Sequence, residues 1–553
     1  MQGAFIATFG IVLSKILGMI YVIPFYSIIG DQGGALYGYA YSIYAIFLGI
    51  SQAGIPLAIS KIISEYNVLG YYNAKKRAFK LGKKTLMTLG IICFIIMFIF
   101  AGGIADIIIG DITGGNTKED VTFVIRVIST AILVVPLLSI SRGYLQGHKY
   151  IAPTSVSQVL EQLVRVFIII FGSYFAINVF HLSLTTAVGI AVFSATAGAL
   201  CSYFYLVVKI NKNKKQLERE TLKVKEPKIT DQEIIKKILV YAFPFIMIDV
   251  FKSLINSVDV FMLVKVLVNG IGYTTTQAEA IMSVVSTWGL KINMIIVSIA
   301  TGLMVSLIPN LTASFVKKDM KDVKSKINQT LQVLLFFTIP MTFGLSVLAK
   351  PVWTVFYGVS EFGPNVYQYY VFVALATTLF TVSITILQLL KEYKRVFIGL
   401  LTGLLTNALF NIPLLYGFHK MGLPAYYGSI TSTILGYSVC SFLSLHYIGK
   451  KYKVNYEDTL KKVFNILIIT IFMVAILLII RYFIPFTSTS RLTNILLIII
   501  YVIIGATIYL GIMIKAKLIN QIFGEENINK IMKKIRKVRW LYEILCINWR
   551  RIS

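Results

Sequence analysis

The chain has 553 residues, of which 57% are hydrophobic and only 14% are charged, and its formal net charge is +29. A soluble protein carries about a quarter charged residues, so water cannot be the solvent for most of this surface. The Lys and Arg residues lie in short segments between apolar runs, a placement typical of cytoplasmic loops in membrane proteins. This placement argues against a nucleic-acid-binding domain.

The apolar runs predict an all-α integral membrane protein with about fourteen transmembrane helices, because each run can cross about 30 Å of hydrocarbon. In chain order the predicted helices are 4–29, 36–66, 85–109, 121–147, 152–180, 182–208, 234–264, 278–312, 327–349, 364–390, 395–416, 422–449, 462–483 and 492–514. Basic residues gather at 75–84, 317–326 and 450–453, whereas the connections 30–35 and 485–490 lack them. This alternation predicts that both termini are cytoplasmic.

The chain divides into two related halves. The charged segment 211–232 separates them, and the Ile-Pro pair at 55–56 recurs at 308–309, in each case before a basic connection. Paired halves are typical of transporters that alternate access. The predicted domains are an N-terminal six-helix lobe at 1–210, a cytoplasmic linker at 211–232, a pseudo-symmetric C-terminal six-helix lobe at 233–450, two further helices at 451–518, and a basic cytoplasmic tail at 519–553.

The tail combines Lys and Arg with apolar residues at helical spacing. This pattern predicts an amphipathic helix on the anionic inner leaflet, with a disordered basic tail as the alternative.

Three lysines within predicted helices are candidates for a binding site. Lys15 and Lys291 lie near the middle of their helices with no acidic residue close in sequence, and Lys61 lies nearer the cytoplasmic end. A charge at the centre of a membrane costs at least about 2.5–3.5 kcal/mol, so such residues usually face a polar cavity or a partner. If the three share one cavity, its guest is an anion such as a phosphate or pyrophosphate. The alternatives are snorkelling, pairing of Lys61 with Glu65, or acids on other helices such as Asp249.

Two pairs of opposite charges lie within single predicted helices. Glu161 and Arg165 are spaced i, i+4, and Asp249 and Lys252 are spaced i, i+3, so each pair can meet on one helix face. We expect these four residues to support the packing or to take part in coupling, and the Glu161–Arg165 pair to hold its helix in place.

Catalytic motifs are missing from the sequence: it has no phosphate loop, no HExxH and no GxSxG. The four cysteines, Cys93, Cys201, Cys440 and Cys546, lack metal-ligand spacing. We therefore expect no enzyme activity, no metal and no cofactor.

Segments 141–147 and 153–165 carry a more specific signal. Their distinctive residues are Arg142, Gly143, Gln146, Gly147, Pro153, Thr154 and Gln158. These segments, together with 14–18, 54–61 and 411–436, resemble the polysaccharide-biosynthesis flippases, the group that holds stage V sporulation protein B and the MurJ lipid II flippases. The resemblance extends over nearly the whole chain.

The resemblance implies the fold of the MOP exporter superfamily, with two lobes around a central cavity and two C-terminal helices that form a groove for a polyprenyl tail. It implies a multi-pass protein of the bacterial cell membrane. It also implies that Lys15, Lys61 and Lys291 match basic cavity positions of the family, whereas Tyr21 stands where a second helix 1 arginine is common.

The leading hypothesis is a flippase that moves an undecaprenyl-pyrophosphate-linked saccharide from the inner to the outer leaflet, with lipid II for peptidoglycan synthesis as the favoured substrate. The expected partners are this lipid, the anionic inner leaflet and the cell-wall synthesis machinery. The alternatives are a flippase for a teichoic, capsular or exopolysaccharide precursor, a cation-coupled multidrug exporter, or a membrane scaffold for wall synthesis. A cationic cavity disfavours the drug exporter, and unpaired buried lysines disfavour the scaffold.

Overall fold

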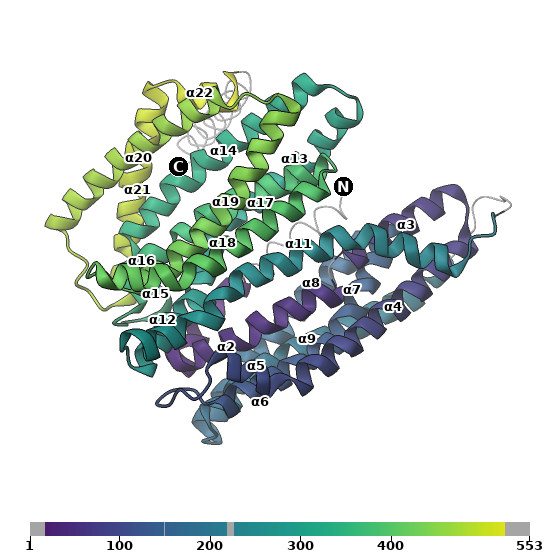
Figure 1. The fold of residues 1–553 in the computed structure, drawn as a ribbon, viewed down its shortest axis with the longest axis horizontal. Coiled ribbons are helices and arrows are strands. Elements are labelled where there is room, and N and C mark those ends of the chain that lie inside the picture. Colours follow the sequence, from purple (N-terminus) through teal and green to yellow (C-terminus); the bar gives the residue numbers. More distant parts are fainter. Residues whose placement is uncertain (1–16, 53, 149, 218–225, 526–553) are drawn as a thin grey trace, which may run out of the picture. The chain divides into compact units, whose positions relative to one another are not determined.

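The computed structural model describes residues 17–52, 54–148, 150–217 and 226–525. Within these ranges the chain forms helices joined by turns and contains no strand (Figure 1). Hydrocarbon imposes this architecture, because a helix pairs its backbone N–H and C=O groups internally. Thirteen helices of the described chain are long and apolar enough to cross a membrane. The first, Leu17–Leu69, takes in most of two predicted helices, so the protein is an all-α, multi-pass membrane protein as predicted.

The helices before the charged linker follow the predicted order. They are α2 (Val22–Gln52), α3 (Ile55–Leu69), α4 (Tyr72–Ile99), α5 (Ala101–Ile108), α6 (Lys118–Ser129), α7 (Ala131–Gly147), α8 (Ile151–Phe167), the π-helical segments η1 (Ile168–Gly172) and η2 (Phe175–Val179), α9 (Leu184–Lys212) and α10 (Lys214–Leu217).

The helices after the linker begin with a long one. They are α11 (Asp231–Lys265), η3 (Val266–Ile271), α12 (Thr275–Ser283), η4 (Val284–Trp288), α13 (Gly289–Val316), α14 (Met320–Val347), α15 (Ala349–Tyr357), α16 (Gly363–Tyr370), α17 (Phe372–Leu389), α18 (Tyr393–Lys420), α19 (Tyr426–Tyr452), α20 (Glu457–Phe483), α21 (Arg491–Lys515) and α22 (Leu518–Phe523).

The largest differences from the predicted boundaries lie in the first third of the chain. Gly30, with φ of 61°, turns the chain inside α2, so the segment 30–35 is not a separate loop. The predicted helix 36–66 breaks before Gly54, whose φ of 74° suits a residue without a side chain. The basic segment 75–84 belongs to α4, because Lys and Arg are good helix formers outside the membrane as well.

Contacts divide the described chain into two compact units. The first holds residues up to 294 together with 356–373 and 393–440, and the second holds 295–355, 374–392 and residues from 441 onward. The domain boundaries predicted at 210, 232, 450 and 518 remain a prediction, and the tail beyond residue 525 lies outside the described residues.

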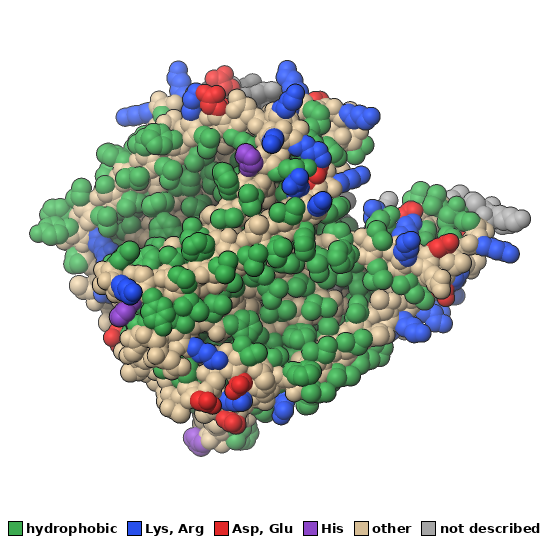
Figure 2. All heavy atoms as spheres, in the orientation of Figure 1, with side chains coloured by type: hydrophobic (Ala, Val, Ile, Leu, Met, Phe, Trp, Pro, Cys, Tyr) green, Lys and Arg blue, Asp and Glu red, His purple; other side chains and the backbone are tan. Residues whose placement is uncertain are grey.

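Hydrophobic side chains cover much of the surface, as Figure 2 shows for one face. On α20, for example, Leu460, Phe464, Ile468 and Ile471 are all exposed. Contiguous exposed apolar surface of this kind is incompatible with water, so these side chains face lipid.

Within the first unit, two glycines let α2 approach η4 closely. A Cβ at Gly34 would lie 2.2 Å from Trp288 Nε1, and a Cβ at Gly38 would lie 2.1 Å from Ser286 Oγ. Trp288 is fully buried there, and its ring packs edge-on against Phe25. This contact fixes the start of α13 against α2, which matters for the site described below.

The predicted topology can be tested with single cysteines in a background that lacks the four native ones. Thr489 lies in the turn between α20 and α21, and Lys450 lies near the end of α19; both are exposed. We expect an impermeant thiol reagent added outside the cell to label Thr489→Cys and to spare Lys450→Cys until the membrane is permeabilised. The reverse labelling pattern would overturn the assignment of both termini to the cytoplasm.

Candidate functional site

Lys291 lies near the middle of the membrane span Thr275–Met304. It follows directly on η4, a π-helical turn that interrupts the regular helix between α12 and α13. Its side chain is half-buried, and the Nζ atom lies 5.4 Å from the centre of the Tyr21 ring. A ring face attracts a cation but does not neutralise it.

Arg165 lies at the middle of another span, Ile151–Val179. Its Nη2 atom donates a hydrogen bond to the Tyr41 hydroxyl oxygen on α2 at 2.5 Å, and the guanidinium carbon lies 5.0 Å from the centre of the Tyr41 ring. Gly198 on α9 allows this placement, because a Cβ there would lie 2.8 Å from the Glu161 carbonyl oxygen. The close approach of α9 therefore sets the position of α8 and of Arg165.

The aromatic partners of Arg165 and Lys291 lie in one cluster of rings. The ring centres of Tyr21 and Phe25 lie 6.1 Å apart, and those of Phe25 and Tyr37 lie 5.3 Å apart. Tyr37 in turn packs against Tyr41 on α2, with the two ring centres 4.4 Å apart. Throughout the described chain, no carboxylate forms an ion pair with either cation. Two positive charges without a counter-charge inside a membrane make a site for an anion.

The predicted pair of Glu161 with Arg165 does not form. Glu161 instead accepts a hydrogen bond from Arg142 Nη2 on α7 at 2.7 Å, with side-chain exposures of 23% and 15%. Arg142 also donates from Nε to Ser157 Oγ at 2.9 Å. Helical spacing places Arg165 within reach of Glu161, but Arg142 binds both Glu161 and Ser157 of α8. Arg165 binds Tyr41 instead.

The aromatic neighbour of Lys61 differs from that of Lys291. Its Nζ atom lies 4.0 Å from the centre of the Tyr241 ring, and the side chain is exposed. Glu65, the partner that the sequence suggested, pairs with Lys237 at 2.7 Å. Lys15 lies outside the described residues, so the convergence of the three lysines stays a prediction.

Asp249 and Lys252 interact electrostatically but form no ion pair in the described chain. Asp249 is exposed on α11. The backbone of α11 passes close to Gly49 at this point. A self-contained ion pair is therefore not the role of these two residues.

Three of the distinctive residues of 141–158, Gly143, Gly147 and Thr154, make packing contacts within the first unit. A Cβ at Gly143 would lie 2.5 Å from the Pro56 carbonyl oxygen, and one at Gly147 would lie 2.8 Å from that of Ser60. This pair of small residues on α7 lets α3 approach closely, as is common between membrane helices. Thr154 is buried, and its hydroxyl donates a hydrogen bond to the Ile151 carbonyl oxygen.

Asp259 is a buried acid that the sequence analysis did not single out. Its carboxylate accepts hydrogen bonds from Asn411 at 2.8 Å, from Thr433 at 2.9 Å and from Ser429. These neutral donors come from α18 and α19 and satisfy the carboxylate without a described Lys or Arg. An Asp inside an apolar run could have marked Asp259 as a candidate site residue. Its hydrogen-bond partners could not be predicted, because they lie about 150 residues or more further along the chain.

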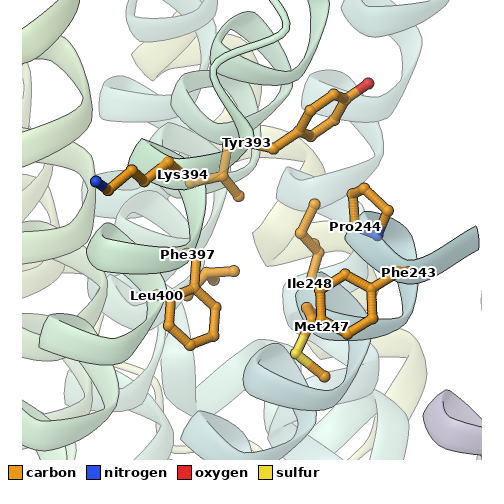
Figure 3. A pocket seen from close by; sticks show the side chains of 9 residues that line it. Phe243, Pro244, Met247, Ile248, Tyr393, Lys394, Phe397 and Leu400 are labelled. Carbon is orange, nitrogen blue, oxygen red and sulfur yellow. The ribbon is translucent and has the colours of Figure 1, made fainter. Parts of the chain in front are cut away.

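Two cavities in the described chain are apolar. One of about 230 Å³ lies between α11 and α18 in the first unit (Figure 3). The Lys394 ammonium and the Tyr393 hydroxyl point away from the space between Phe397 and Met247. The other cavity, of about 410 Å³, lies in the second unit between α14, α20 and α21, and its lining includes Gly344, Met473 and Gly505. Neither lining suits a charged head group.

Comparisons with known proteins show which family and fold the chain resembles. The family model described as "Polysaccharide biosynthesis protein" matches residues 1–311. The chain is 31% identical over 519 residues to the lipid II flippase MurJ of Bacillus subtilis (strain 168), with 92% of this chain and 94% of that protein covered.

Two solved structures share the fold. One is the lipid II flippase MurJ in an inward closed conformation, at 17% identity and a TM-score of 0.61, with 94% of this chain and 99% of that chain covered. The other is an inward-facing multidrug resistance MATE family transporter of the MOP superfamily, at 14% identity and a TM-score of 0.58, with 81% and 98% covered.

The Arg142–Glu161 pair predicts a specific pattern of stabilities. Removing one partner as Arg142→Gln or Glu161→Gln should lower the stability of the purified protein by about 3 kcal/mol, because the remaining charge is left in a poorly solvated place. The double variant should lose less than the sum of the two, as measured by thermal unfolding in a double-mutant cycle. The same cycle with Glu161 and Arg165 is the control, and stronger coupling there would contradict the observed pairing.

Proposed function

Because the chain belongs to the polysaccharide biosynthesis protein family, we propose that it is a flippase for an undecaprenyl-pyrophosphate-linked saccharide. Lipid II is the saccharide lipid that we favour, since a relative that is 31% identical over 92% of this chain is a lipid II flippase. In this proposal the protein is a transporter rather than an enzyme. It moves the head group from the inner to the outer leaflet by alternating access of its two lobes.

The observation that carries the proposal is Lys291, a half-buried cation near the middle of its span with no carboxylate partner in the described chain. An anionic head group would supply the missing counter-charge, whereas a cationic drug would be repelled. A membrane scaffold has no use for a charge that weakens its own fold.

The apolar cavity of the second unit supports the same substrate class. A polyprenyl tail needs a dry, apolar lining, and the walls from α14, α20 and α21 offer one. We propose that the helices of 451–518 hold the lipid tail there, with α14 as the facing wall. The head group and the tail thus find separate surfaces that suit their different chemistry.

We expect depletion of the protein in its host to make lipid II accumulate in the inner leaflet. A plasmid copy of the wild type or of Lys80→Gln, which alters an exposed lysine on α4, should restore the normal level. Lys291→Gln should be made and inserted normally but should fail to restore it, because the head group loses its cation; Lys291→Arg should restore part of it. If a different lipid-linked glycan accumulates, that glycan and not lipid II is the substrate. Full rescue by Lys291→Gln would refute the role of this lysine.

The tail cavity can be tested by filling it. Gly344 lines the cavity and a Cβ there would meet nothing within 4 Å, so Gly344→Phe should fit the fold while occupying the cavity. Gly511 on α21 is equally open but lies outside the lining, which makes Gly511→Phe the matched control. We expect the first variant to lower flipping of the lipid in proteoliposomes about tenfold and the second to have little effect. Equal activities of the two variants would argue against tail binding in this cavity.

A further inference from the structure

Arg165 brings a guanidinium to the candidate site, although the sequence suggested that it pairs with Glu161. Both Arg165 and Lys291 lie at the middle of their spans, and each contacts a tyrosine of the segment 21–41. A continuous row of rings, Tyr21, Phe25, Tyr37 and Tyr41, links the two cations, with successive ring centres 4.4–6.1 Å apart. The described residues around them therefore form a compact group of two cations and an aromatic wall.

Two acids of the first unit are engaged elsewhere. Glu161 lies one helical turn before Arg165 but is paired with Arg142. Asp259 is buried among the neutral donors Asn411, Ser429 and Thr433. The protein thus keeps two like charges together without a described carboxylate partner, and this arrangement costs free energy in the absence of an anion.

We propose that Arg165 and Lys291 form a single diphosphate-binding site, in which Arg165 selects lipid diphosphates over lipid monophosphates. The inference rests on the proposed function and adds to it a binding residue and a basis for selectivity. Lys291 supplies a compact charge with three donors for one phosphate group. Arg165 supplies a planar fork of donors that can bridge oxygens of the other.

Tyr41 acts as a positioning residue for this fork. It accepts a hydrogen bond from only one nitrogen of Arg165, Nη2, and its ring lies 5.0 Å from the guanidinium carbon. A guanidinium held in one orientation loses less conformational freedom on binding than a free one.

The test uses the purified full chain in lipid nanodiscs, with undecaprenyl diphosphate and undecaprenyl monophosphate as probes. We expect the wild type to bind the diphosphate more tightly. Arg165→Lys keeps the charge but loses the fork, so it should weaken diphosphate binding about tenfold and monophosphate binding much less. Tyr41→Phe should shift the preference in the same direction by a smaller factor. Arg126→Lys is the matched control, because Arg126 also contacts an aromatic ring, that of Phe98, but lies outside the site.

Thermal unfolding without ligand separates binding from a structural role. If Arg165→Lys unfolds at a lower temperature and loses affinity for both lipids alike, Arg165 is a packing residue and the inference is wrong. Unchanged binding of both lipids by Arg165→Lys would overturn it as well. Failure of the wild type to bind either lipid would instead refute the proposed function, so the two failures can be told apart.

Discussion

The constraint on which the structure depends is the poor ability of hydrocarbon to solvate a charge. Arg165 and Lys291 both lie near the middle of membrane spans, where each charge costs at least about 2.5–3.5 kcal/mol. Among the described residues, the ring faces of Tyr21 and Tyr41 and the Tyr41 hydroxyl reduce this cost. No described carboxylate forms an ion pair with either cation, so we expect binding of an anion to lower this cost further.

The surrounding contacts engage two acids of the first unit with other partners. Arg142 holds Glu161 from a neighbouring helix, and three neutral side chains hold the carboxylate of Asp259. Glycines make such contacts possible, because Gly143, Gly147 and Gly198 bring helix backbones within reach of one another. The same close packing that orders the helices thus also decides which charges are neutralised and which remain free to meet a ligand.

The helices could be predicted well from the sequence, whereas the partners of the charges could not. Run length and the placement of Lys and Arg identify membrane spans because both follow from the solvent. Spacing within one helix placed Glu161 and Arg165 on one face, but their real partners come from α7 and α2. Asp259 escaped notice for the same reason, since its donors lie on helices distant in sequence. Local periodicity determines which face a residue occupies, and tertiary packing determines what that face meets.

The two compact units offer different chemistry, and this difference bears on the kind of ligand. The first unit holds the paired cations, and the second holds an apolar cavity of about 410 Å³. A free phosphate would need only the first, and a simple hydrocarbon only the second. Under the proposed function, the charged head of an amphipathic lipid suits the first unit, and its long apolar tail suits the second. A lipid-linked saccharide meets this description because its diphosphate joins a polar head group to a polyprenyl chain. The polyprenyl chain can stay in an apolar environment while the head group crosses the membrane.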